Sequence, residues 1–226
     1  MKDKDIGFGV EIELSYLAKE LFLYEFKQPV FSCSLSNEEC CNKISQPSAF
    51  FKHCYKCRQF SEFRIKSDYS IKGRNPREIT TPILKGKEGL EKLKYLCTTL
   101  EYCVSSVNDS CGLHIHIDAS CMSDAQIIQL MKIYQREEDA IDARMHPNRR
   151  GNNCEYCKSL KGIDFDSATC FDDLYKLIPN RGYKVNIYSL KKYGTIEFRH
   201  HHGTFNYEEI RSWIEFIMQM IKRAKA

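Results

Sequence analysis

The sequence contains no long apolar segment. Hydrophobic residues make up 42% of the 226 residues, but no run of them approaches the roughly 18 residues that a transmembrane helix needs. The first residues, Met1 to Asp5, are charged and do not have the apolar stretch and small-residue cleavage site of a secretory signal. We therefore expect a soluble, cytoplasmic protein with no membrane partner.

The chain also lacks a strong charge imbalance. Its 34 Lys and Arg residues and 30 Asp and Glu residues give a net charge of +4, and the two signs are interspersed. Nucleic-acid-binding proteins usually gather Lys and Arg into a stripe, so we expect no nucleic-acid partner. The chain has neither a Gly-x-x-x-x-Gly-Lys loop nor a Rossmann fingerprint, so no nucleotide-binding motif is present.

Cysteine, in contrast, is abundant, with twelve residues. Disulfide scaffolds with so much cysteine are usually much shorter and exported, so we expect reduced thiols. A stretch at about 26–62 has no regular hydrophobic pattern and carries many of these cysteines. We interpret the chain as one domain, 1–226, with a Cys-rich insertion in this stretch.

The insertion carries a candidate structural zinc site. Its predicted ligands are Cys40, Cys41, Cys54 and Cys57. Their spacing is similar to that of a zinc knuckle, and a short insertion without a hydrophobic core needs a bound ion of this kind to stabilise its fold. The alternative is that they are unpaired apolar fillers. Cys154 and Cys157 could supply missing ligands, whereas a redox role is disfavoured because they follow a polar loop and not a strand.

Hydrophobic periodicity predicts an α+β fold. Strands are expected at 6–17, 63–71, 78–84, 112–118, 184–190 and 195–201, and amphipathic helices at 88–103, 123–144 and from about 207 onward. The second and third strands are expected to form a hairpin around a turn at 73–76. We expect an antiparallel sheet with helices on its apolar face.

Three of these strands share an unusual construction, with an aliphatic face and an ionisable face. The ionisable positions are Glu11 and Glu13, then His114, His116 and Asp118, and then Glu197 and Arg199. Alternation also places His201 beside Glu197 and Arg199, with His200 under the sheet and His202 at a bend. Several buried charges on one face need partners or an ion, so we interpret this face as a metal cup.

The identity of the ion is open at this stage. Carboxylates suit Mg²⁺ or Mn²⁺, and added imidazoles favour Mn²⁺, Zn²⁺ or Fe²⁺. Residues two apart on a strand lie roughly 6.5 to 7 Å apart, so Glu11 and Glu13 could each contact a different ion. The alternative for any single pair is a solvated strand face, and only the three strands together favour metal.

Four segments together resemble the amidoligases, compact relatives of glutamine synthetase and glutamate–cysteine ligase. These are Gly9 to Leu14, Ser67 to Ser70 with Arg77 to Leu84, Cys111 to His116, and Thr195 to Thr204. Their order and spacing match over most of the chain outside 26–62. The resemblance implies a glutamine synthetase-like catalytic domain whose sheet holds ATP through Mg²⁺ or Mn²⁺. A carboxylate of an amino acid, peptide or protein would be phosphorylated, and an amine would then attack the acyl phosphate.

The resemblance also implies roles for individual residues. The metal ligands would be Glu11, Glu13, Glu78, His114 and Glu197. The nucleotide phosphates would be bound by His116, Arg181 and Arg199, and the catalytic residues would be Glu197, Arg181 and Arg199. One departure is Asn186, which stands where glutamine synthetase has a second arginine. Arg149 and Arg150 could replace that charge, although loop arginines are more often solvated.

Two other functions remain open from the residues alone. The same cup could belong to a metal-dependent hydrolase that lowers the pKa of a bound water. Alternatively, the chain could be a non-enzymatic, zinc-stabilised interaction module in which the insertion at 26–62 is the functional part. Turnover without ATP would favour the hydrolase, and partner binding by a variant with a disabled cup would favour the module.

Overall fold

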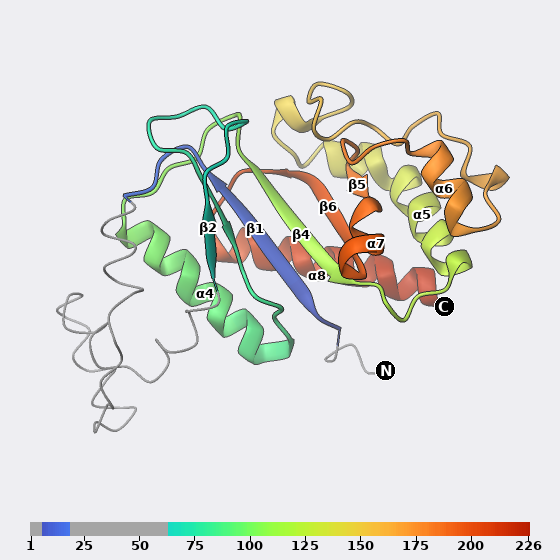
Figure 1. The fold of residues 1–226 in the computed structure, drawn as a ribbon, viewed down its shortest axis with the longest axis horizontal. Coiled ribbons are helices and arrows are strands. Elements are labelled where there is room, and N and C mark those ends of the chain that lie inside the picture. The colour runs from blue at the N-terminus through green and yellow to red at the C-terminus, as the bar shows by residue number, and fades with distance from the viewer. Residues whose placement is uncertain (1–5, 19–62) are drawn as a thin grey trace.

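One antiparallel sheet organises the fold (Figure 1). The structure is a computed structural model, and it describes residues 6–18 and 63–226. The strands of this part are β1 (Phe8–Leu14), β2 (Arg64–Lys66), β3 (Arg77–Thr80), β4 (Gly112–Asp118), β5 (Val185–Asn186) and β6 (Thr195–His202). They are arranged in the order β2-β3-β1-β4-β6-β5, and all neighbouring strands are antiparallel. The prediction of an α+β fold is confirmed, and β2 and β3 pair as predicted, but β2 ends at Lys66 and the connection is longer than the predicted turn at 73–76.

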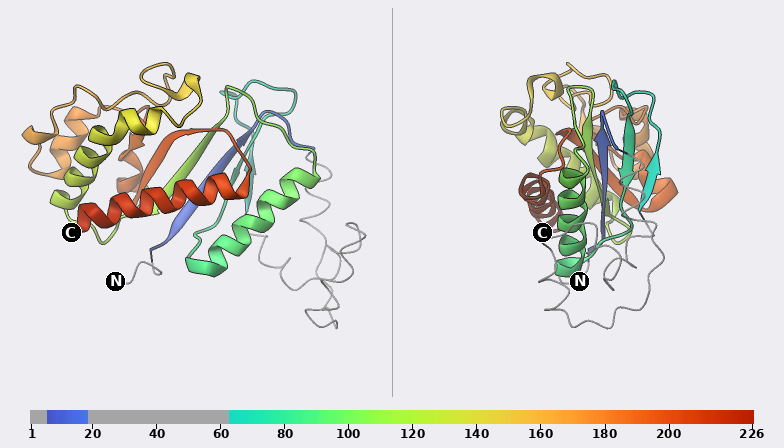
Figure 2. Two further views of the ribbon diagram at one scale, coloured as in Figure 1. Left: turned by 180° about the vertical axis from the view of Figure 1, so that it is seen from behind. Right: turned by 90° about the vertical axis from the view of Figure 1, so that its left-hand side faces the viewer.

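Helices cover one face of this sheet. The helices of the described residues are α4 (Gly86–Tyr102), α5 (Asp124–Asp142), α6 (Phe171–Leu177), α7 (Tyr188–Tyr193) and α8 (Tyr207–Lys225), with 3₁₀ turns at Pro147–Arg149 and Phe165–Ser167. Figure 2 shows α4 and α8 lying along one side of the strands, and α5 packs against α8. None of the described helices is long and apolar enough to cross a membrane.

Local sequence explains where α5 and α8 begin. The Ser123 hydroxyl accepts a hydrogen bond from the Gln126 amide, and the Gln126 side chain accepts one from the Ser123 amide, which completes a capping box for α5. The Asn206 side chain accepts a hydrogen bond from the Glu209 amide at the start of α8. These capped helices present apolar faces to the strand side chains Val10, Ile12, Ile115 and Ile117, all of which are fully buried.

The prediction of a strand at 184–190 is wrong for most of that range. Only Val185 and Asn186 form β5, and the helix α7 begins at Tyr188. The Asn186 side-chain oxygen accepts a hydrogen bond from the Tyr188 amide at 2.8 Å, a local contact that competes with strand pairing. The Ser189 hydroxyl donates to the Asn186 carbonyl at 3.3 Å. These side-chain contacts turn the chain, so the alternating pattern does not continue as a strand.

A β-bulge in β6 overturns a second prediction. Ile115 pairs with Phe198, but Leu113 pairs with His201, so β6 has one extra residue in this stretch. Directly paired residues point to the same side of a sheet, which places His201 on the same side as Leu113. Its ring packs on Trp213 of α8, with the ring centroids 5.5 Å apart. His201 therefore does not lie beside Glu197 and Arg199, as simple alternation predicts.

Candidate metal and phosphate site

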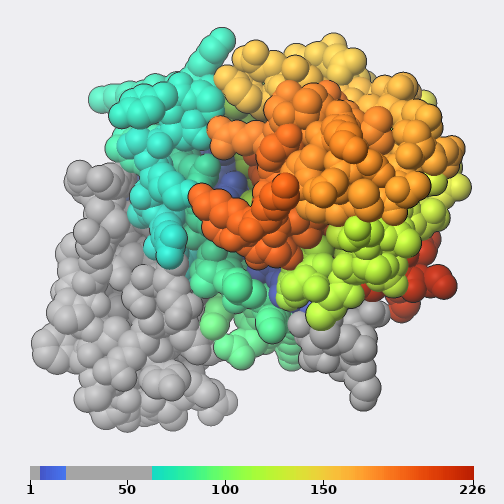
Figure 3. Space-filling view, turned by 45° about the vertical axis from the view of Figure 1, so that its right-hand side comes forward, coloured from blue at the N-terminus to red at the C-terminus, as the bar shows by residue number. Residues whose placement is uncertain are grey.

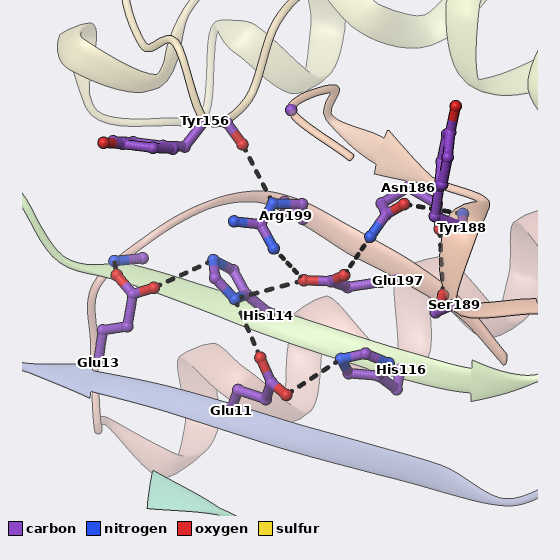
Figure 4. A network of polar contacts seen from close by, with 12 residues as sticks. Glu11, Glu13, His114, His116, Tyr156, Asn186, Tyr188, Ser189, Glu197 and Arg199 are labelled. Atoms are coloured by element: carbon purple, nitrogen blue, oxygen red, sulfur yellow. Dashed lines mark hydrogen bonds and ion pairs between the residues drawn. The ribbon is translucent and has the colours of Figure 1, made fainter. Parts of the chain in front are cut away.

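The strand register gathers the ionisable side chains on the face opposite α4 and α8. Glu11 on β1 pairs with His114 on β4, and His116 on β4 pairs with Glu197 on β6. Figure 4 shows these side chains pointing toward one another above the sheet. In the space-filling view, blue atoms of β1 lie at the bottom of a hollow between the β2–β3 segment and the β5–α7 segment (Figure 3). We call this hollow the cup.

Three carboxylates surround the imidazole of His114. Its Nδ1 lies 3.3 Å from a Glu11 oxygen and 3.5 Å from a Glu197 oxygen, and its Nε2 lies 3.5 Å from a Glu13 oxygen. His114 is only 3% exposed, so these contacts lie in a poorly solvated environment. Glu13 also accepts a hydrogen bond from the Gly112 amide at 2.6 Å. The floor of the cup is therefore an acidic cluster organised around one histidine.

The carboxylates of the cup differ in their tendency to ionise. Burial disfavours the charged form of Glu11, but the contacts with His114 and His116 outweigh burial and hold its pKa well below the usual range. Burial likewise opposes ionisation of Glu197, and the electrostatic effects of His114 and Arg199 overcome it and lower its pKa. For Glu13 burial prevails and its pKa is raised. The cup thus holds at least two carboxylates in the charged form that hard cations prefer.

His116 lies at the open end of this cluster. Its Nδ1 is 3.2 Å from the Thr195 hydroxyl, and its buried Nε2 lies 3.4 Å from a Glu11 oxygen without the geometry of a hydrogen bond. Burial tends to lower the pKa of His116, but Glu11 and Glu197 outweigh that effect and raise it. One ligand atom each from Glu11, His116 and Glu197 lie within 4.8 Å of one another. One imidazole nitrogen and two carboxylates at this spacing are a donor set that fits a divalent ion.

Glu197 is held from two sides. The Asn186 side chain donates a hydrogen bond to one carboxylate oxygen at 2.6 Å, and the Arg199 guanidinium forms an ion pair with the other. Arg199 in turn donates through its Nε to the Tyr156 carbonyl at 3.1 Å. Asn186 is identified in the sequence only as a departure from the ligase pattern. The structure shows that Asn186 orients the Glu197 carboxylate. The sequence does not reveal this role, because it depends on the pairing of β5 with β6.

Arg149 is a second residue that the sequence does not identify correctly. The interpretation as a solvated loop arginine is wrong, because Arg149 is 3% exposed. It donates to the Arg199 carbonyl at 2.5 Å, and its charge lowers the pKa of Glu13, against the larger effect of burial. A Cβ on Gly112 would lie 2.9 Å from both Arg149 Nη2 and His114 Nε2. Arg149 and His114 therefore leave no room for a side chain at position 112.

Two of the predicted site residues lie apart from the cluster. Glu78 pairs in register with Glu13, but its carboxylate accepts hydrogen bonds from Lys66 and Thr80, each at 3.0 Å. It does not belong to the group of close ligand atoms around Glu11. Arg181 is exposed in the loop before β5 and forms no hydrogen bond or ion pair with another described residue. Neither side chain reaches the cluster in this conformation.

The cysteine pair at 154 and 157 contacts Arg149. The Arg149 guanidinium donates to Cys154 Sγ at 3.4 Å, and the Cys157 amide donates to the Cys154 carbonyl at 3.2 Å in a tight turn. A hydrogen bond from the Cys157 thiol, helped by Arg149, lowers the pKa of Cys154 to about 5. The same contact, together with burial, raises the pKa of Cys157. The candidate zinc ligands Cys40, Cys41, Cys54 and Cys57 lie outside the described residues.

Comparison with known proteins identifies the family of this chain. No curated protein matches it. A family model described as putative amidoligase enzyme matches residues 4–163, well over half of the chain. The matched range contains Glu11, Glu13, His114 and His116, and Glu197 lies beyond it on β6. The strands β1 and β4 that carry the cup histidine and its acidic neighbours are thus within the match, and the chain belongs to the family of putative amidoligase enzymes.

Proposed function

We propose that the protein is an ATP-dependent carboxylate–amine ligase that acts through an acyl phosphate. The observation that carries this proposal is the group formed by Glu11, His116 and Glu197, next to the ion-paired Arg199. Membership of an amidoligase family supports a ligase, and the composition of the cup supports a reaction between two anions. ATP phosphates and a substrate carboxylate repel each other, so a site that joins them needs both cation ligands and a guanidinium.

Several residues would hold the divalent ions. Glu11, His116 and Glu197 form the group whose ligand atoms lie closest together, and His114 and Glu13 adjoin it. Glu78 could join only after leaving Lys66, which is 3.0 Å away. Bound Mg²⁺ or Mn²⁺ would offset the negative charge of the ATP phosphates and of the transferred phosphoryl group.

The cationic side chains of Arg199 and Arg181 would bind the phosphates. Arg199 uses Nε for the Tyr156 carbonyl and Nη1 for Glu197, which fixes the plane of its guanidinium. Its other N–H groups have no partner among the described residues and can donate to a phosphoryl oxygen. Arg181 is exposed in the segment that leads into β5. In this proposal it contacts the phosphates only when nucleotide is bound.

The reaction would proceed in two balanced steps. A carboxylate oxygen of the first substrate attacks the terminal phosphorus of ATP, the bond to ADP breaks, and an acyl phosphate forms. The nitrogen of the second substrate then attacks the acyl carbon, phosphate leaves, and the amine proton passes to solvent. The α+β sheet and its cup would in this proposal correspond to a glutamine synthetase-like catalytic domain.

The test is an assay of the full chain with ATP, Mg²⁺ and a pool of amines and carboxylates. We expect ADP, phosphate and a new amide, identified by mass spectrometry, in equal amounts. Glu197→Gln should abolish the product, because Glu197 is a buried cup carboxylate. Glu88→Gln, on the surface of α4, is the matched control and should be fully active. Absence of phosphate release above the Glu197→Gln background would refute the proposal, and turnover without ATP would favour the hydrolase instead.

A further inference from the structure

A second group of ionisable side chains lies at the end of β6, away from the cup. One ligand atom each from His201, His202 and Glu209 lie within 4.8 Å of one another. The bulge in β6 turns His201 toward α8, and Glu209 lies in the first turn of that helix. The two imidazole rings are stacked, with their centroids 4.4 Å apart. This second group therefore depends on the same bulge that removes His201 from the cup.

The hydrogen bonds of His201 fix its tautomer. Its Nδ1 lies 2.8 Å from the carbonyl oxygen of His202, which can only accept a hydrogen bond. Nδ1 therefore carries a hydrogen, and in the neutral ring Nε2 carries a lone pair. That Nε2 lies 3.9 Å from Glu209 Oε1. A backbone carbonyl that binds one ring nitrogen and leaves the other free is the usual arrangement behind a metal-binding histidine.

Glu209 also lies close to the imidazole of His202. Its Oε1 lies 2.9 Å from His202 Nε2, so one carboxylate oxygen is near both rings. Its other oxygen accepts a hydrogen bond from the Thr204 hydroxyl at 2.7 Å, which orients the carboxylate. The Nδ1 of His202 is buried and has no hydrogen-bond partner among the described residues. The nitrogen of His202 that faces Glu209 is therefore Nε2 and not Nδ1.

A cavity adjoins the group. It has a volume of about 200 Å³, and its lining includes His202, His146, Asp109 and Asn148. A water molecule occupies roughly 30 Å³ in the liquid, so the cavity has room for several. The His146 ring lies 6.4 Å from the His202 ring, centroid to centroid, and His146 is not part of the three-residue group. Solvent can thus reach the group from the side of His202.

We propose that His201, His202 and Glu209 bind a transition-metal ion of the zinc class, at a site separate from the cup. Two imidazoles and one carboxylate are a ligand set that Zn²⁺ uses, with a fourth position left to water. Mg²⁺ is disfavoured because it prefers oxygen ligands. The adjoining cavity, which His202 lines, gives solvent access to that ring. This inference does not depend on ligase activity.

The experiment measures Co²⁺ binding to the chelator-treated full chain by equilibrium dialysis and visible absorption. Co²⁺ is a spectroscopic stand-in for Zn²⁺. We expect His202→Ala and Glu209→Gln each to bind one equivalent less than the unaltered protein, or to bind it at least tenfold more weakly. His146 lines the same cavity but is not a proposed ligand, so His146→Ala should bind as much Co²⁺ as the unaltered protein. Glu197→Gln should lose only ions bound in the cup, which separates the two sites.

A structural role for Glu209 is distinguished by a further variant. Thr204→Ala removes the hydrogen bond to Glu209 but leaves the three metal donors in place, so it should retain Co²⁺ even if its melting temperature falls. Circular dichroism confirms that each variant is folded. Equal Co²⁺ stoichiometry and identical absorption in the unaltered protein and in folded His202→Ala would overturn the proposal. Ligase activity could be lost or retained in either case, so the two proposals fail independently.

Discussion

The side-chain amide of Asn186 donates a 2.6 Å hydrogen bond to the Glu197 carboxylate, between two directly paired residues of β5 and β6. An amide orients the carboxylate without neutralising it, whereas a guanidinium at the same place would add a positive charge. Arg199 already supplies one such charge on the other oxygen. Glu197 therefore remains able to bind a cation while its orientation is fixed from both sides.

Removing this hydrogen bond should weaken ion binding in the cup. We expect Asn186→Ala to lower the affinity for Mn²⁺ by about 10- to 100-fold, the usual effect of losing a group that orients a metal ligand. Isothermal titration with Mn²⁺ measures the change. Ser189→Ala is the control, because Ser189 anchors α7 to Asn186 and Thr195 without touching Glu197. Unchanged Mn²⁺ affinity in Asn186→Ala would show that the amide has no such role.

Cys154 should react with alkylating agents at an unusually low pH. Its thiolate is stabilised by the Cys157 thiol and then by Arg149, which lower its pKa to about 5, and only the thiolate is alkylated. Iodoacetamide should therefore modify Cys154 readily at pH 6.5, with a midpoint near pH 5, as followed by peptide mass spectrometry. Cys157→Ala should move the midpoint upward, whereas Cys121→Ser should leave it in place. An identical midpoint in Cys157→Ala would contradict this explanation.

His200 should make the fold sensitive to acid. Its Nδ1 lies 2.7 Å from the Tyr134 hydroxyl and its Nε2 lies 2.6 Å from Asp142. Burial and then the charge of Lys184 lower the pKa of His200 to about 3. Because the folded pKa lies below the unfolded value of about 6.5, the unfolded chain binds the proton first. Stability is full above pH 6.5 and falls below it, by up to about 1.4 kcal/mol per pH unit for this one group.

The matching variant isolates this contribution from those of other histidines. His200→Gln removes the titrating group, so its free energy of unfolding should depend less on pH than that of the unaltered protein. Urea unfolding at pH 7.5 and pH 5 measures both. The two proteins should differ most at pH 7.5 and approach each other at pH 5. A gap of the same size at both values would mean that His200 does not titrate in this range.

Gly73 should tolerate no side chain. A Cβ at this position would lie 1.9 Å from the backbone oxygen of Ser15, and backbone cannot move aside as a side chain can. Gly73→Ala should lower the free energy of unfolding by about 1–3 kcal/mol or more, measured with urea. Gly9→Ala provides the comparison, since its Cβ would meet only the His116 Cβ at 3.7 Å. Equal stability of the two variants would refute the steric explanation.

The elements that bury a continuous apolar face could be predicted from the sequence. The strands β1 and β4 alternate regularly, and α5 and α8 carry caps and apolar stripes. The prediction failed where a side chain competes with the backbone, as Asn186 does with its hydrogen bond to the Tyr188 amide. It failed again at the bulge near His201, because one extra residue changes the face of every residue after it.

The candidate site shows the same division. Alternation placed Glu11, His114 and Glu197 on one face, and the strand order then brought them together. The burial of Arg149 could not be predicted, because its contact with the Arg199 carbonyl joins segments 50 residues apart. The orientation of Glu78 toward Lys66 depends on a pairing between edge strands that periodicity does not specify. The ion and the substrates of the cup stay predictions.

The two outermost strands of the sheet have a practical consequence. β2 contains three residues and β5 only two, and Arg64 and Lys66 of β2 are exposed. Short edges that carry basic side chains disfavour the addition of a strand from another molecule. The sheet that supports the cup should therefore resist edge-to-edge aggregation, which suits the concentrated solutions that calorimetric titration requires.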